Sequence, residues 1–128
     1  MKTIYIVLFT CALAKMVAQK QYSCYRIQEF LWNEKTQKYD SLVGKADSSI
    51  FKFNDEKKTI QQVFADGSVS ELVINSIKAE NEIVTYQVIS PTNGYHYLYK
   101  IYIKSSLIEI SLNENNQQII LKKYLFKN

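Results

Sequence analysis

Tyrosines are the side chains in this sequence whose type and spacing could do chemistry, and that chemistry would be the binding of a ligand. In the stretch NGYHYLYKIYIK, Tyr95, Tyr97 and Tyr99 alternate, and Ile101 and Ile103 continue the same spacing. Alternate residues of a β-strand lie on one face of the sheet. A phenol offers a ligand an aromatic face and a hydroxyl, but it also fills a core when the hydroxyl finds a partner. The stripe is therefore either the wall of a binding site or the inside of a β core.

Neighbouring strands are expected to agree about the inward face of this stripe, since a slip of one residue would reverse every side chain. Closing residues 82–90 on residues 94–104 around the turn PTNG pairs Val88 with Tyr97, Tyr86 with Tyr99 and Val84 with Ile101. The next strand, residues 106–112, then pairs Tyr97 with Leu112, Tyr99 with Ile110 and Ile101 with Ile108. The last strand is expected to place Ile119 beside Ile110 and Leu121 beside Ile108. The outward residues of these strands are His96, Lys100, Tyr102, Lys104, Glu109 and Gln87.

The inward face is expected to have an aromatic end and an aliphatic end. Tyr86, Tyr97 and Tyr99 gather near the PTNG turn, and the opposite end is lined by Val84, Ile101, Ile103 and Ile108. The three tyrosines, together with Trp32, are the candidate ligand-binding residues. Two arrangements are open: a filled core with hydroxyls emerging at its rim, or a ring of phenols around the mouth of a cavity. The many bulky side chains favour the filled core.

The whole chain carries a rhythm of β-prone runs and polar turns, which predicts an all-β fold. Strands are expected at residues 22–32, 38–43, 48–54, 58–65, 68–77, 82–90, 94–104, 106–112 and 117–126. Asp66-Gly67 predicts a type I′ hairpin turn. Beyond Lys122 the alternation breaks, which predicts a bulge or burial on both faces. So many sequential antiparallel strands favour an up-and-down meander closed into a small barrel, with a two-sheet sandwich as the alternative.

Residues 1–18 have the layout of a secretory signal peptide, so residues 19–128 are expected to form the single domain. A short basic start precedes the apolar run TIYIVLFTCALA, which is too short to span a membrane. Cleavage after Ala18 is favoured, and cleavage after Ala14 is the alternative. The mature protein is therefore expected to be exported, to the periplasm or out of the cell, and not to be an integral membrane protein.

Composition and charge argue against several classes of function. Removing residues 1–18 takes away Lys2 and Lys15 and no acids, which lowers the formal net charge from +4 to +2, and no dense basic patch remains for nucleic acid. The only histidine, His96, is expected on the outer face, where it cannot serve a catalytic triad. One histidine and one mature cysteine, Cys24, cannot close a metal site, and Cys24 is expected to be a small buried residue. We expect a protein that is not an enzyme and carries no cofactor.

The exported start, a first hairpin in LWNEKTQKYDSL, a second in SSIFKFNDEKKTI and a terminal meander resemble the lipocalin-like, or calycin-type, group of small β-barrels. The chain is also similar in pattern to small exported barrel proteins of unknown function from Gram-negative bacteria. The resemblance implies a barrel that often holds a small apolar molecule, and it carries over no particular ligand.

Two classes of function follow from these features. The first is a barrel that binds a small apolar or amphipathic ligand in its interior. The second is a protein-interaction module, such as an inhibitor in the cell envelope or outside the cell, which would use outward aromatic residues such as Tyr102 and the asparagine-rich loops. A hydrolase built on paired carboxylates is a weaker third hypothesis, because the acids lie mostly in turns.

Overall fold

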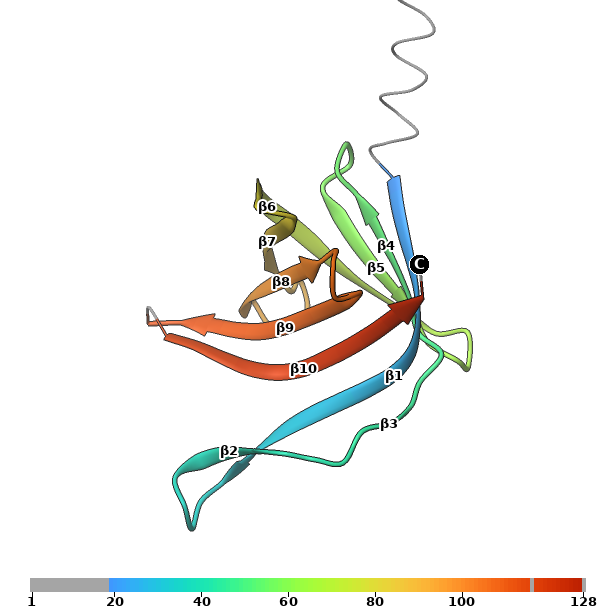
Figure 1. Cartoon of the computed structure of the whole chain (residues 1–128). Coiled ribbons are helices and arrows are strands. Elements are labelled where there is room, and N and C mark those ends of the chain that lie inside the picture. The colour runs from blue at the N-terminus through green and yellow to red at the C-terminus, as the bar shows by residue number, and fades with distance from the viewer. Residues whose placement is uncertain (1–18, 116, 128) are drawn as a thin grey trace, which may run out of the picture.

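Antiparallel strands that follow one another along the chain form the described part of the protein, residues 19–115 and 117–127 of a computed structural model (Figure 1). The predicted signal peptide, residues 1–18, lies outside the described residues. The strands are β1 (Gln19–Asn33), β2 (Lys38–Ser41), β3 (Lys45–Ala46), β4 (Ile50–Asn54), β5 (Thr59–Val63), β6 (Val69–Glu80), β7 (Ile83–Ile89), β8 (His96–Tyr102), β9 (Leu107–Glu114) and β10 (Gln117–Lys127). No helix among the described residues is long and apolar enough to cross a membrane.

Strand β1 closes the sheet into a barrel of eight strands. Strands β4 to β10 form the predicted meander, and β1 pairs with both of its edges. Its first part, Gln19–Ser23, pairs with β4, and the part from Ser23 to Glu29 pairs with β10 across a bulge between Cys24 and Arg26. The all-β barrel is therefore confirmed over the sandwich alternative. The two extra strands, β2 and β3, pair with β1, and the two-residue β3 was not predicted.

The turns of the meander fall at two ends of the barrel, because consecutive strands run in opposite directions. The turns after β4, β6 and β8 lie at one end, which we call the packed end. The turns after β5, β7 and β9, including the PTNG turn, lie at the other, which we call the pocket end.

The predicted register of the central strands is confirmed, and that of the last strand is wrong. All six predicted pairs of β7, β8 and β9 are observed, from Val88 opposite Tyr97 to Ile101 opposite Ile108. On β10, however, Ile119 lies opposite Leu112, and the register shifts between Ile120 and Lys122. The predicted break in alternation is thus a β-bulge, which comes earlier than expected. It places Tyr124, not Leu121, opposite Ile108.

The Asp66-Gly67 turn joins β5 and β6 as predicted, but it is not of type I′. Such a turn needs positive φ at both central residues, and of the two only Gly67 has it, at 86°. The Gly67 amide donates to the carbonyl of Phe64, and the Phe64 amide donates to the carbonyl of Ser68. The hairpin is therefore a type I turn followed by a glycine in the left-handed region.

The core lies inside the barrel and is rich in aromatic rings. Phe51, Phe53, Tyr86 and Tyr124 are buried to 2% exposure or less, and Phe51 contacts the rings of Tyr124 and Tyr99 at centroid distances of 4.9 and 6.3 Å. Cys24 is buried, as predicted. Ile103, which was expected to line the aliphatic end, is instead 46% exposed, because β8 ends at Tyr102. His96 is exposed on the outer face, where the register placed it.

The hairpin of β1 and β2 extends away from the barrel (lower left in Figure 1). It carries Trp32 and Tyr39, which lie opposite each other in the register and contact each other at a ring-centroid distance of 5.0 Å. Both rings remain partly open to solvent, with exposed fractions of 47% and 36%. The hairpin thus presents aromatic surface outside the core.

Candidate ligand-binding pocket

The four candidate residues do not form one site. Tyr97 and Tyr99 lie together at the pocket end. Tyr86 is 1% exposed, and its hydroxyl donates to Asp55 Oδ1 at 3.2 Å, in the turn after β4 at the packed end. Trp32 lies on the projecting β1–β2 hairpin and not among the phenols. The phenols therefore point to both ends of the barrel, where the sequence had suggested a single cluster.

A pocket of about 360 Å³ opens at the pocket end beside Tyr97 and Tyr99. Its apolar lining comes from both sides of the barrel mouth: Phe64, Leu72, Tyr97, Tyr99, Ile110 and Leu121. Its polar lining comes from the segment after β7 and from three strands: Ser90, Thr92 and Asn93, with Gln62, Ser70 and Lys122. The volume is at the lower end of the range of about 300 to 1,000 Å³ that is typical of small-molecule sites.

The hydroxyl of Tyr99 is placed to meet the contents of this pocket. Burial raises the pKa of Tyr99, and the neighbouring Tyr124 and Tyr97 raise it further, so the phenol is neutral at physiological pH. No hydrogen bond from this hydroxyl to another described residue is seen. Among those residues, no fully enclosed side-chain nitrogen or oxygen lacks a partner. The Tyr99 hydroxyl therefore borders the pocket space, where water or a ligand can reach it.

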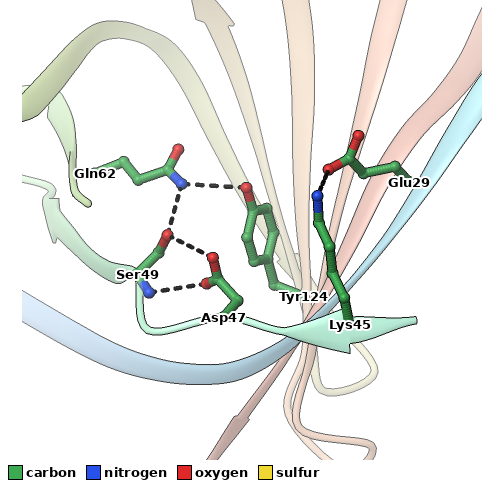
Figure 2. Close-up of polar contacts among 6 residues, drawn as sticks. All are labelled: Glu29, Lys45, Asp47, Ser49, Gln62 and Tyr124. Carbon is green, nitrogen blue, oxygen red and sulfur yellow. Dashed lines mark hydrogen bonds and ion pairs between the residues drawn. The ribbon is translucent and has the colours of Figure 1, made fainter. Parts of the chain in front are cut away.

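Lys122 brings a positive charge to the same pocket. The bulge in β10 pairs Lys122 with Ile110, a core residue, so both side chains lie on the inward face. Glu29, which lies opposite Lys122 on β1, pairs instead with Lys45 at 3.0 Å (Figure 2). No carboxylate among the described residues forms an ion pair with Lys122. The pocket therefore combines an apolar wall with an ammonium group that forms no ion pair with any described residue.

A network of polar side chains lies beneath the pocket (Figure 2). The Gln62 amide donates to the Tyr124 hydroxyl and to Ser49 Oγ, both at 3.1 Å. Ser49 donates from its amide and its hydroxyl to the carboxylate of Asp47, at 2.8 and 3.2 Å. Burial raises the pKa of Tyr124 to about 12, against the lowering effect of the Gln62 hydrogen bond. The network ties the segment that leads into β4 to strands β5 and β10.

The thiol of Cys24 is not an activated nucleophile. Its side chain is 6% exposed, and its amide donates to the carbonyl of Ser49 at 2.9 Å. Burial, and after it the negative charge of Asp47, raises the pKa of Cys24 to about 12. A thiolate is the reactive form, so this environment suppresses its chemistry.

Sequence reasoning missed the polar residues of the site. Gln62 could have been found, because it shares the alternation of Ile60, which lies in the core. The inward direction of Lys122 could not have been predicted from the sequence, since it depends on the position of the bulge. Asp47 and Ser49 lie in an irregular segment, where no periodicity marks a facing direction.

Another hollow, of about 380 Å³, lies along β1, β4 and β5 and reaches the turn that follows β4. It is lined mostly by exposed or half-buried polar side chains, including Lys20, Lys52 and Lys57, and Phe53 is its one apolar lining residue. We therefore regard the smaller inward-facing pocket as the candidate site. No group of three or more His, Cys, Asp or Glu side chains within the described ranges is placed to hold a metal ion.

The closed barrel of eight antiparallel strands is compatible with a lipocalin-like fold. No protein-family model, curated protein or solved structure matches the chain.

Proposed function

We propose that this protein is a non-enzymatic, exported barrel that binds a small amphipathic molecule with an anionic head group at its pocket end. The observation that carries the proposal is the combination of an apolar and aromatic wall with Lys122 in one inward-facing pocket of about 360 Å³. The apolar tail would lie against Tyr97, Tyr99 and Leu121. The head group would meet the Lys122 ammonium.

The filled core limits how such a ligand would enter. Phe51, Ile101 and Ile108 are fully buried below the pocket, so a ligand would occupy the mouth of the barrel and would not pass through it. A short single chain suits this shape better than a bulky ring system. The pocket volume sets the same limit, because it is at the lower end of the usual range.

The test is a calorimetric titration of the folded protein with three probes that share one tail: dodecanoate, dodecanol and dodecylammonium, each below its micellar concentration. We expect saturable binding of one dodecanoate, weaker binding of dodecanol, and the weakest binding of dodecylammonium. The absence of saturable binding by all three probes would remove the ligand proposal.

Variants of two adjacent lysines distinguish binding of the anion in the pocket from its attraction to the general surface charge. Lys122→Met should weaken dodecanoate binding by roughly fivefold to tenfold, because a partly exposed ion pair contributes about 1 kcal/mol. The affinity for dodecanol should not change. Lys123→Met is the matched control, because Lys123 lies over the ring of Phe30 outside the pocket. Equal losses in the two variants would show that the anion is held by surface charge alone.

Export is tested separately by sequencing the amino terminus of the protein isolated from its own host. We expect the chain to begin at Gln19, or at Lys15 if cleavage follows Ala14. A chain that retains Met1 would contradict export through a cleaved signal peptide. Native mass spectrometry of the same material would reveal a small molecule that purifies with the protein.

The exposed aromatic pair Trp32 and Tyr39 favours the second class of function, a protein-interaction module. Large rings exposed on a projecting hairpin are enriched at interfaces between proteins. Tyr102, which the sequence suggested for this role, is half-buried on the barrel wall.

A further inference from the structure

The free edge of strand β2 is an unpaired sheet edge on the projecting hairpin. Within the described ranges, β2 pairs only with β1, and its four residues, Lys38–Ser41, are all exposed. Proteins usually cover or interrupt such edges, since their backbone groups can pair with another strand. In this edge Lys38 and Asp40 alternate with Tyr39 and Ser41, so the edge carries one charge of each sign and no net charge that would repel a second copy.

The backbone of β2 is oriented for pairing at Tyr39. The Leu42 amide, just beyond the end of β2, donates to the carbonyl of Glu29 at 2.8 Å, so it faces β1. Backbone groups of an antiparallel strand face its two neighbours alternately. The amides and carbonyls of Tyr39 and Ser41 therefore face the free edge. A second antiparallel strand could exchange two hydrogen bonds with Tyr39.

We propose that two copies of this chain associate by pairing their β2 strands antiparallel, with Tyr39 on the two-fold axis. In this register Lys38 lies opposite Asp40 of the second copy, and Asp40 lies opposite Lys38 of the second copy. The edge is thus complementary to itself in charge, which a two-fold interface requires. Asp40 keeps one oxygen for this contact, because Asn33 Nδ2 donates to its Oδ2 at 2.7 Å.

The aromatic rings agree with the same register. Trp32 and Tyr39 lie opposite each other and therefore on one face of the hairpin, whereas Lys38 and Asp40 lie on the other face. Pairing about Tyr39 would bring the two Trp32–Tyr39 pairs into one row of four rings across four strands. Cross-strand aromatic pairs stabilise a sheet. Charges on one face and rings on the other would both favour the pairing.

A dimer built in this way is closed and weak. Each chain uses its β2 edge once, so the contact yields a dimer and not a fibre. The strand is short, with four residues in β2, and an interface of this kind belongs to the small, transient class. We expect association that is visible only at high micromolar to millimolar protein concentration. The pocket end and its ligand play no part in it.

Sedimentation equilibrium of the full folded protein over this concentration range, in low salt, tests the proposal. We expect a monomer–dimer equilibrium for the wild type. K38D and D40K should each weaken it by at least about tenfold, because each places like charges opposite one another at both contacts. An equimolar mixture of K38D and D40K should restore the dimer, since one variant presents two carboxylates and the other two ammonium groups on the same face.

The mixture makes the test independent of any damage to the hairpin. D40K also loses the Asn33 hydrogen bond, but K38D keeps it, so a mixture that associates more strongly than K38D alone cannot be explained by an undamaged hairpin. The double variant K38D/D40K should associate like the wild type. A wild type that stays monomeric at about 1 mM would overturn the proposal and leave this edge to a strand of a different protein. A mixture that associates no better than its components would equally overturn the register centred on Tyr39.

Discussion

The packed end and the pocket end of the barrel are built from the same strands, yet they are filled differently. At the packed end, Tyr86 and Phe53 lie with ring centroids 4.8 Å apart, and the Tyr86 hydroxyl has a partner in Asp55. At the pocket end, Tyr97 and Tyr99 border a hollow of about 360 Å³. Cross-strand neighbours Tyr86 and Tyr99 thus have different surroundings. The same residue type packs or lines a pocket according to the turns and loops that lie above it.

The largest expected effect is a loss of stability at alkaline pH, which reports how completely the interior is packed. Burial raises the pKa of Tyr86 and Tyr99, that of Tyr124 to about 12, and that of Cys24 from 9.0 to about 12. These groups keep their protons in the folded state after the unfolded chain has lost them. The free energy of unfolding should therefore fall as pH rises above about 9 for Cys24 and above about 10 for the tyrosines.

Each of these buried groups contributes a slope of about 1.4 kcal/mol per pH unit between its unfolded and folded pKa values. Urea unfolding at pH 8 to 11, with tyrosine ionisation followed by ultraviolet absorbance, measures the effect. Tyr86→Phe should reduce the pH dependence of the free energy of unfolding by the contribution of one buried group. Tyr95→Phe, at an exposed position, should leave this pH dependence unchanged. A free energy of unfolding that stays constant up to pH 11 would mean that water reaches the interior phenols.

The next effect concerns the centre of the packed interior. Phe51→Ala should lower the free energy of unfolding by about 3 to 5 kcal/mol, because the ring is fully buried and its removal leaves a cavity. Phe64→Ala, at the edge of the pocket, should cost about 1 kcal/mol or less, since that ring is 36% exposed. Urea denaturation of the two variants gives the difference. Equal costs would contradict the contrast between the packed interior and the wall of the pocket.

The sequence was sufficient for the strands and for the central register, because both depend on local alternation. The pairs of β7, β8 and β9 were predictable since short turns join these strands and leave one register with a shared apolar face. The alternation of Ile60 and Gln62 likewise marked an inward polar residue.

The candidate site was less predictable, because its polar groups depend on irregular backbone. The bulge between Ile120 and Lys122 turns a lysine into the barrel, and its position follows from packing that no local pattern encodes. The partner of Tyr86 comes from the distant turn that holds Asp55. Trp32 alternates correctly with its strand, but β1 extends beyond the barrel at this point, so the residue leaves the core altogether.

A smaller effect is expected from the network beneath the pocket. Tyr124→Phe removes the hydroxyl that accepts from Gln62 and should cost about 1 kcal/mol, since the Gln62 amide keeps its bond to Ser49. Tyr97→Phe is the control at the pocket wall and should stay within about 0.5 kcal/mol. Chemical denaturation at neutral pH distinguishes the two. If Tyr124→Phe leaves the free energy of unfolding unchanged, the network does not hold the segment before β4 against the barrel.

The smallest effect on stability is expected from the projecting hairpin, where the contrast with the packed interior is sharpest. Trp32→Ala should change the free energy of unfolding by about 0.5 kcal/mol or less, because the ring is 47% exposed and contacts Tyr39 outside the core. The same substitution should weaken the proposed dimer, so sedimentation at high protein concentration should respond to it, whereas thermal unfolding at low concentration should hardly change. A cost in thermal unfolding comparable to that of Phe51→Ala would mean that the hairpin folds as part of the barrel core. Trp32 is the single tryptophan of the sequence. If its ring stabilises the monomer this little, a contact outside the monomer explains its position better than packing within the monomer does.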